Sequence, residues 1–289
     1  MNLPVFPDFR ALVLEDREEL EPFFRRFPQE ISESTFANHF IWRRFDDPRF
    51  TLINGNLCIR FSPPDQEAYF LQPLGENDIP ATINACLSAA PRLSRIPASF
   101  AERWCGGLRC APDLDDFDYV YRTEDLAELK GKRYDGKRNR IKKFEKSHAW
   151  RYVPIGPGDL DACRALFEEW LAGKGQEGGA IDAQKDAIQE ALLHYRTLGL
   201  IGGAIETEGA LAALAIGERL NARTAVIHIE IVSPRYEGLA QLMNREYVRR
   251  EWADSAFINR EQDLGVPGLR RAKQSYHPDH LVEKYHILA

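Results

Sequence analysis

Three strand-like runs in the second half of the chain place the strongest constraint on its fold. They cover residues 198–206, 210–219 and 224–232, and only short turns separate them. Runs of this length, rich in Ala, Ile, Leu and Val, are typical of buried strands, and short turns join antiparallel neighbours. The chain is therefore expected to contain an antiparallel sheet against which its helices pack.

The elements around these runs alternate between helix and strand. The patterns predict a strand and two helices before the three runs, and helix, strand, helix and strand after them. The predicted elements cover residues 150–155, 160–171 and 182–195 before the runs, and 237–252, 256–259, 268–275 and 281–287 after them. The second half is expected to be a mixed, mostly antiparallel sheet flanked by helices.

The first half has the same mixed character. Asn54-Gly55 between two apolar runs predicts a β-hairpin. In the predicted helix 16–27, Leu20, Phe23, Phe24 and Phe27 recur at helical spacing and form the expected buried face. The other predicted elements are strands 50–53, 57–61, 68–71 and 95–99 and a helix over 79–89. Because an acidic loop over 111–118 ends this half, we expect two α+β domains, residues 1–117 and 118–289.

A basic segment over residues 130–146 opens the second domain. From Lys130 to Arg151 there are ten Lys or Arg residues and two acids, a formal charge of +8 in a chain whose net charge is −6. Such a concentration of charge can hold an anion, and a solvated helix face is the alternative interpretation. The candidate anion-binding residues of this segment are Lys130, Lys132, Arg138, Asn139 and Lys142.

Composition narrows the class of protein. The chain is 44% apolar and 28% charged, which is typical of a globular protein. It has no run of 18 apolar residues and no secretory signal, so we expect a cytoplasmic protein without a membrane span. Five cysteines at irregular spacing fit neither a disulfide framework nor a zinc site, so buried free thiols and no metal are expected.

Polar residues gather late in the second half. His228 and Glu230 share one face of the expected strand 224–232, since side chains alternate along a strand. A polar run, Asn259-Arg-Glu-Gln-Asp263, directly follows the next expected strand. Arg270, Lys273 and Tyr276 then recur at three-residue spacing on one side of a short helix. A solvated turn and a packed tyrosine are the alternatives to a site here.

Two kinds of resemblance follow from these patterns. The element order of each half resembles the Gcn5-related N-acetyltransferase (GNAT) fold, and two such halves resemble the tandem Fem-type aminoacyltransferases. Several motifs resemble the phosphatidylglycerol lysyltransferase C-terminal-domain family over nearly the whole chain. These motifs are Phe36–Trp42, Lys130-Gly-Lys, Lys137-Arg-Asn with Phe144, Asn259–Gly265 and Gly268–Pro278. The characterised lysyltransferases have a membrane-spanning half that this chain lacks, which leaves a lipid acceptor open.

The resemblance implies an acyltransferase. In characterised relatives an aminoacyl group moves from aminoacyl-tRNA to a hydroxyl or amine. From the residues themselves we expect Glu230, His228, Asp263 and Tyr276 to be catalytic. Glu230 with His228 would handle protons, Tyr276 would donate a proton, and Asp263 with Glu261 would recognise an amino group. The remaining candidate substrate contacts are Asn259, Arg260, Arg270 and Lys273. No tightly bound cofactor is expected, and tRNA would bind through its phosphates, with a small molecule or phospholipid headgroup as acceptor and no role for DNA.

Two alternatives stay open. Arg235-Tyr-Glu-Gly238-Leu-Ala240 matches the R-x-x-G-x-A form of the GNAT pyrophosphate loop, in which glycine lets backbone N–H groups approach phosphate. An acyl-CoA-dependent N-acyltransferase is therefore the second hypothesis, with acyl-CoA as co-substrate. A non-catalytic protein that binds a phosphorylated ligand or RNA is the third. A peripheral position at the membrane is the alternative to a free cytoplasmic protein.

Overall fold

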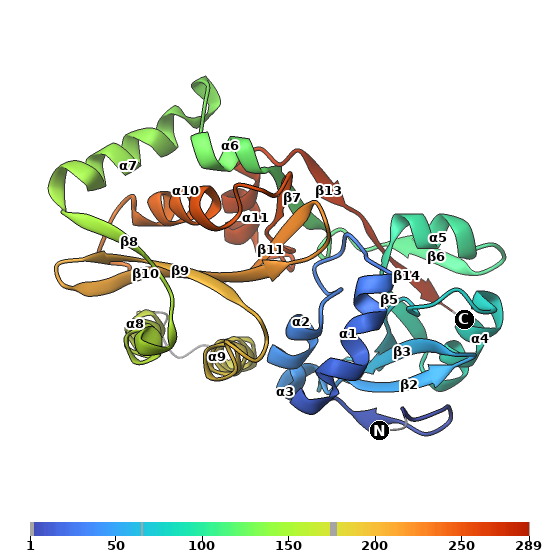
Figure 1. The fold of residues 1–289 in the computed structure, drawn as a ribbon. Coiled ribbons are helices and arrows are strands. Elements are labelled where there is room, and N and C mark those ends of the chain that lie inside the picture. Colours follow the sequence, from blue (N-terminus) through green and yellow to red (C-terminus); the bar gives the residue numbers. More distant parts are fainter. Residues whose placement is uncertain (1–2, 65, 174–177, 289) are drawn as a thin grey trace. The chain divides into compact units, whose positions relative to one another are not determined.

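The chain forms two compact units. The structure, a computed structural model, describes residues 3–64, 66–173 and 178–288. One unit comprises Met1–Asp118, Gln262–Arg270 and Leu281–Ala289, and the other comprises Tyr119–Glu261 and Arg271–His280. Each unit is built around one seven-stranded sheet (Figure 1). This α+β organisation is the one that the strand and helix patterns predict.

The sheet of the first unit has the strand order β1-β2-β3-β4-β5-β14-β6. Its strands are β1 (Arg10–Ala11), β2 (Arg49–Ile53), β3 (Asn56–Phe61), β4 (Tyr69–Phe70), β5 (Arg92–Pro97), β6 (Arg109–Pro112) and β14 (Lys284–Leu288). The helices are α1 (Arg17–Arg26), α2 (Phe36–Ile41), α3 (Arg43–Asp46), α4 (Ile79–Ala89) and α5 (Ala98–Trp104), and a 3-10 turn over Leu14–Asp16 precedes α1.

The predicted hairpin in this unit is confirmed. β2 and β3 pair antiparallel with Ile53 opposite Asn56, so Asn54 and Gly55 form the two-residue connection. Both turn residues have positive φ, 53° at Asn54 and 79° at Gly55, as this turn type requires.

The sheet of the second unit has the order β13-β7-β12-β11-β10-β9-β8. Its strands are β7 (Asp118–Arg122), β8 (Trp150–Pro154), β9 (Ile201–Thr207), β10 (Ala210–Arg219), β11 (Thr224–Val232), β12 (Phe257–Asn259) and β13 (His280–Val282). The helices are α6 (Thr123–Glu128), α7 (Asp135–Ser147), α8 (Leu160–Ala172), α9 (Gly178–Leu193) and α10 (Leu239–Glu251), with 3-10 turns over Lys132–Tyr134 and Pro157–Asp159. The residues of α11 (Pro267–Gln274) are divided between the two units after Arg270.

The three predicted central strands are present and antiparallel. β10 pairs with β9 on one side and with β11 on the other. Figure 1 shows α8 and α9 on one face of this sheet and α10 and α7 on the opposite face. The alternation predicted for β11 is also confirmed, because Ile227, Ile229 and Ile231 are buried.

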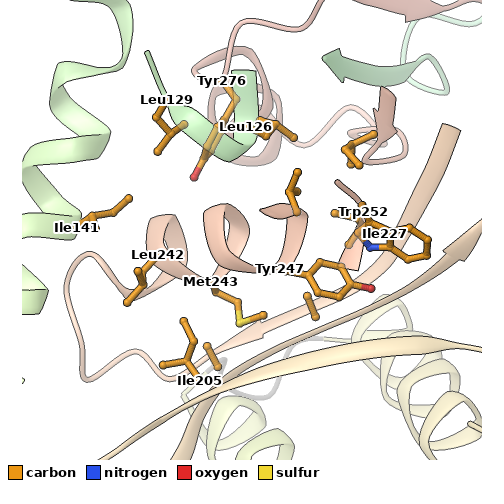
Figure 2. Close-up of a cluster of buried hydrophobic side chains, with 14 of the residues drawn as sticks. Leu126, Leu129, Ile141, Ile205, Ile227, Leu242, Met243, Tyr247, Trp252 and Tyr276 are labelled. Carbon is orange, nitrogen blue, oxygen red and sulfur yellow. The ribbon is translucent and has the colours of Figure 1, made fainter. Parts of the chain in front are cut away.

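Helix α10 forms the centre of the second core. Leu242, Met243 and Tyr247 on its buried side meet Ile205 of β9 and Ile227 of β11, all within one hydrophobic cluster (Figure 2). Each such buried side chain stabilises the fold by about 1.5–3 kcal/mol. Tyr134, Ile141 and Phe144 join the same cluster, so the narrow apolar stripe predicted for the basic segment is its packing surface.

The last strand departs from the sequence-based prediction. The pattern places a strand over 281–287 at the end of the second half. Instead, β14 pairs antiparallel with β5 and β6 of the first unit, with Ile287 opposite Leu93 and Cys110. Strand pairing between distant segments is decided by tertiary packing, which local periodicity does not encode.

Two smaller differences concern burial. In α1, Leu20 and Phe24 are buried, but Phe23 and Phe27 are only partly covered. All five cysteines are free, but Cys105 and Cys110 are only partly buried, in contrast to the prediction of buried thiols. No helix within the described residues is long and apolar enough to cross a membrane.

Candidate active site

The candidate site lies in the second unit, where β11 and β12 cease to pair. The two strands run parallel, with Thr224, Ala225 and Val226 opposite Phe257, Ile258 and Asn259. β12 then ends, while β11 continues to Val232. Arg260 and Glu261 therefore part from β11 beside the residues His228 and Glu230, while their backbones stay hydrogen-bonded to Tyr119 of β7.

Glu230 is held by groups from two other elements. Arg260 donates from Nε to the Glu230 Oε2 atom over 3.2 Å, and its Nη2 contacts the same oxygen. Asn244 of α10 donates from Nδ2 to Glu230 Oε1 over 3.4 Å. The Glu230 side chain is 27% exposed and that of Arg260 is 14% exposed, so a reactant can reach the carboxylate although the pair is largely covered.

Tyr276 lies among cations next to this pair. The Arg260 guanidinium is 4.9 Å from the Tyr276 ring centroid. The Nζ atom of Lys137, a residue of α7, is 3.5 Å from the same centroid. Burial raises the pKa of the Tyr276 phenol to about 12, although the charge of Arg260 acts in the opposite direction. The phenol is therefore protonated at neutral pH and is a hydrogen-bond donor.

Positive charge around Tyr276 exceeds negative charge. Burial lowers the pKa of Lys137 to about 8, and the nearby guanidinium groups of Arg260 and Arg140 lower it further. Glu230 is the carboxylate paired with Arg260. The Arg260 Nη1 atom is buried and makes no hydrogen bond to any residue that the structure describes. Buried donors normally have partners, so this cationic group has capacity for an anion.

His228 does not have the properties of a general base. Its Nδ1 lies 2.8 Å from Glu261 Oε1 and its Nε2 lies 2.9 Å from Glu218 Oε1, with the side chain only 1% exposed. Burial lowers the pKa of the imidazole, but the hydrogen bonds to the two carboxylates outweigh it and raise the pKa to about 10. The ring is thus an imidazolium that bridges β10, β11 and the segment after β12.

Lys273, Asn259 and Glu261 fix the end of β12. Lys273 donates from Nζ to the backbone oxygen of Glu261 over 3.0 Å and also contacts that of Arg260. Asn259 Oδ1 accepts a hydrogen bond of 2.7 Å from the Glu261 backbone N–H. Glu261 adopts a positive φ of 58°. These contacts set the direction in which Arg260 and Glu261 point.

Asp263 and Arg270 form a separate arrangement within the first unit. Arg270 donates from Nε and Nη2 to the two carboxylate oxygens of Asp263, over 2.7 and 2.8 Å. The Gly265 N–H also donates to Asp263, and Arg270 further contacts Asp115. The predicted catalytic Asp263 is therefore engaged in a bidentate ion pair that shapes the loop after Gln262.

Most of the predicted basic segment is surface or structural. Lys130 contacts Glu128 with 72% of its side chain exposed, and Lys132, Asn139 and Lys142 are exposed. Arg138 donates to the backbone oxygens of Leu129 and Gly131, which lie at the carboxyl end of α6, and pairs with Asp135. Of these five residues, Lys130 and Arg138 contact protein groups, and anion binding by the five stays a prediction.

Lys137, Arg140, Tyr121 and Asn244 are candidate site residues that were not predicted as such, although Lys137 begins one of the family motifs. The Tyr121 ring centroid lies 5.8 Å from the Arg260 guanidinium carbon. Lys137 lies four residues before Ile141, on the apolar stripe of α7. A lysine on a buried stripe was the available signal, since lysines are rarely covered without a functional or structural reason. Tyr121 and Asn244 gave no comparable signal, because an aromatic in a strand and a polar residue in a helix are both common.

The loop that resembles a pyrophosphate site is already occupied by protein groups. Arg235 donates to both carboxylate oxygens of Glu169 in α8, over 2.9 and 2.8 Å. Gly238 has a φ of 90°, and a Cβ there would meet the backbone oxygen of Arg140 at 2.3 Å. The amino end of α10 thus packs directly against the backbone of α7.

Comparison with protein families assigns the chain. The model of the family described as "Phosphatidylglycerol lysyltransferase, C-terminal" matches residues 24–288. The chain belongs to this family. The match spans the resembling motifs of both halves, so the family assignment made from those motifs is confirmed. Among curated proteins, no sequence matches the chain.

Solved structures agree with this assignment. A conserved protein of unknown function from Bacteroides thetaiotaomicron is 28% identical, with a TM-score of 0.90 and complete coverage of both chains. The structure of L-PGS from Bacillus licheniformis is 18% identical with a TM-score of 0.64, covering 100% of this chain and 94% of that one. A tandem GNAT protein from the clavulanic acid pathway is 11% identical with a TM-score of 0.50, covering 96% and 97%. The predicted tandem GNAT-like fold is thereby confirmed.

Proposed function

We propose that this member of the phosphatidylglycerol lysyltransferase C-terminal family is an acyltransferase that moves an aminoacyl group from aminoacyl-tRNA to a hydroxyl or amine acceptor. The family description and the tandem GNAT-like fold support the reaction class. The observation that carries the proposal is one partly exposed carboxylate, Glu230, set beside the partly covered cations Arg260 and Lys137 and a protonated phenol.

Glu230 is the group suited to act on the nucleophile. Aminoacyl transfer requires that a hydroxyl or amine lose a proton as it attacks the ester carbonyl of the donor. Arg260 and Asn244 hold the Glu230 carboxylate in one position, so its free oxygen lone pairs have a defined direction. Positioning of this kind is worth several kcal/mol of the barrier in well-oriented reactions.

Tyr276 and the surrounding cations have complementary roles. The protonated phenol of Tyr276 can donate to the departing ribose oxygen or to the carbonyl oxygen as charge develops on it. Lys137, Arg140 and Arg260 can hold a phosphate, either of the tRNA end or of a phosphate-bearing acceptor. The excess of cations over carboxylates around Tyr276 supports a substrate that brings its own negative charge.

A transfer assay tests the proposal. Radiolabelled aminoacyl-tRNA and acetyl-CoA are offered in parallel to the protein with cell extract as the source of acceptors. We expect label to move from aminoacyl-tRNA, and we expect Glu230→Gln to lower the rate about 100-fold or more because the proton acceptor is lost. Glu237→Gln is the matched control, since Glu237 is exposed and pairs only with Lys143 among the described residues.

Three outcomes separate the hypotheses. Transfer from acetyl-CoA alone would contradict the aminoacyl reaction and favour the acyl-CoA alternative. Binding of coenzyme A or RNA without any transfer would favour a non-catalytic binding protein. Equal activity of Glu230→Gln and the unmodified protein would remove Glu230 from the mechanism while leaving the reaction class intact.

A further inference from the structure

Two aromatic side chains of α1 face a cavity. Phe23 and Phe27 lie four residues apart, one turn of helix, and are only partly covered, whereas Leu20 and Phe24 fill the core. Both line a cavity of about 200 Å³ within the first unit. A pair of phenyl rings left at the edge of an open space offers flat apolar surface that the core does not use.

The wall opposite α1 is held rigid by buried asparagine contacts. Asn56 donates from Nδ2 to the Asn77 backbone oxygen over 2.6 Å, and its Oδ1 accepts from the Asn77 N–H over 3.1 Å. A Cβ on Gly75 would meet Asn56 Oδ1 at 1.9 Å, so only glycine fits there. Gly55 and Gly75 thus contribute backbone without side chains to a preformed surface, which lowers the cost of binding.

Polar groups lie at the margins of this cavity. Glu76 and Asn77 line it and are exposed, and they offer a carboxylate acceptor and an amide that both donates and accepts. Arg26 also lines it, with its guanidinium 5.3 Å from the Phe27 ring centroid. Within the described part of the chain no carboxylate pairs with Arg26, so its charge is available to an anion.

The size and chemistry of the cavity select a class of ligand. It is smaller than the roughly 300–1,000 Å³ of pockets that enclose a drug-sized molecule, so it suits one ring system. A flat ring with polar edges matches the phenyl rings together with Glu76 and Asn77, because aromatic side chains stack on bases of every kind. An anion attached to that ring matches Arg26.

We propose that this cavity binds a nucleotide, with its base against Phe23 and Phe27 and its phosphate at Arg26. The site lies wholly in the first unit and does not involve Glu230, so it goes beyond the proposed acyl transfer and does not depend on it.

Isothermal titration calorimetry of the intact protein tests this proposal. The ligands are adenosine, the four ribonucleoside monophosphates including AMP, and inorganic phosphate. We expect AMP to bind more tightly than adenosine. Phe27→Leu, which keeps the apolar bulk but removes the ring, should weaken both about tenfold. Arg26→Ala should weaken AMP about tenfold and leave adenosine unchanged. Arg25→Ala, at the adjacent exposed arginine that pairs with Glu21, is the control and should change neither.

Several results would overturn the proposal. These are no binding of any of the four nucleoside monophosphates at millimolar concentration, an unchanged Kd in Phe27→Leu, or full displacement of AMP by phosphate alone. Tighter binding of N-acetyltryptophanamide than of AMP would also exclude a nucleotide site. Circular dichroism checks that each variant is folded, and Phe23→Leu supplies a second variant if Phe27→Leu is not.

Discussion

Lys137 shows how a single residue combines stability and function. Its ammonium group lies over Tyr276 with Arg260 and Arg140 nearby, so both burial and like charge disfavour its protonated form. A folded protein that retains such a cation loses some stability unless a ligand supplies the counter-charge. The stability cost of Lys137 can therefore reveal an anion site even when the anion is unknown.

The pH dependence of stability tests this interpretation. The pKa of Lys137 is lowered from 10.5 to about 8 in the folded state, so between these pH values the unfolded chain binds the proton and the folded chain does not. The free energy of unfolding should therefore rise as the pH goes from 8 to 10.5. Lys137→Met should lack this rise and be more stable than the unmodified protein at pH 7 by about 1 kcal/mol, a value reduced for solvent screening.

Urea unfolding of both proteins across this pH range measures the difference, and other titrating groups cancel in the comparison. Lys142→Met, at an exposed lysine of the same helix, is the control and should follow the unmodified protein. Parallel stability curves for Lys137→Met and the unmodified protein would show that Lys137 is an ordinary surface lysine.

Helices α7 and α10 are in direct backbone contact. Gly238 begins α10 with a φ of 90°, and the Arg140 backbone oxygen of α7 occupies the space of a Cβ. The basic segment was predicted from its charge, yet its helix is positioned by this contact and by Ile141 and Phe144 in the core. Packing of α7 decides which basic side chains reach Tyr276 and which remain in solvent.

Gly238→Ala should destabilise the second unit by about 2–4 kcal/mol, since it adds a backbone clash to an unfavourable φ. Gly209→Ala is the matched control, because Gly209 has a φ of 82° but nothing within 4 Å of its Cβ position. The control isolates the cost of φ alone, about 1 kcal/mol. Denaturant unfolding measures both, and equal losses in the two variants would mean that α7 moves aside at little cost.

The sheet of the first unit is built from segments near both ends of the chain. Lys284 in β14 is fully buried and contacts Glu33 Oε1 and Oε2 at 2.9 and 2.7 Å and Asp118 Oδ1 at 2.7 Å. Burial raises the pKa of Glu33, whereas the charge of Lys284 opposes that rise. The sheet is completed only when the last residues of the chain enter between β5 and β6.

Lys284→Met should therefore remove the cation that two buried carboxylates share, leaving Glu33 with Arg95 at 3.5 Å and Asp118 with the hydrogen bonds from Ser32, and should reduce the free energy of unfolding by about 3–5 kcal/mol. Lys130→Met, at a 72% exposed lysine, should cost less than about 0.5 kcal/mol. Thermal and denaturant unfolding provide the comparison. A loss below 1 kcal/mol in Lys284→Met would show that the carboxylates take up protons or water without cost.

Features that depend on local pattern could be predicted from the residues alone. Alternation along β11, the Asn54-Gly55 hairpin, the apolar stripe of α7 and the order of strands and helices all follow from short-range periodicity and turn chemistry. The long motifs identified the family, and Glu230 became a candidate because it is a carboxylate on the polar face of a core strand.

Which charged groups lie next to each other depends on how distant segments pack. The tertiary structure placed β14 in the first unit, joined Asp263 to Arg270, and converted His228 from an expected base into an imidazolium between two carboxylates. In the structure, the lysine beside Tyr276 is Lys137, whereas Lys130, Lys132 and Lys142 of the basic segment are exposed. Burial and distance govern electrostatics, and neither is a property of residues close in sequence.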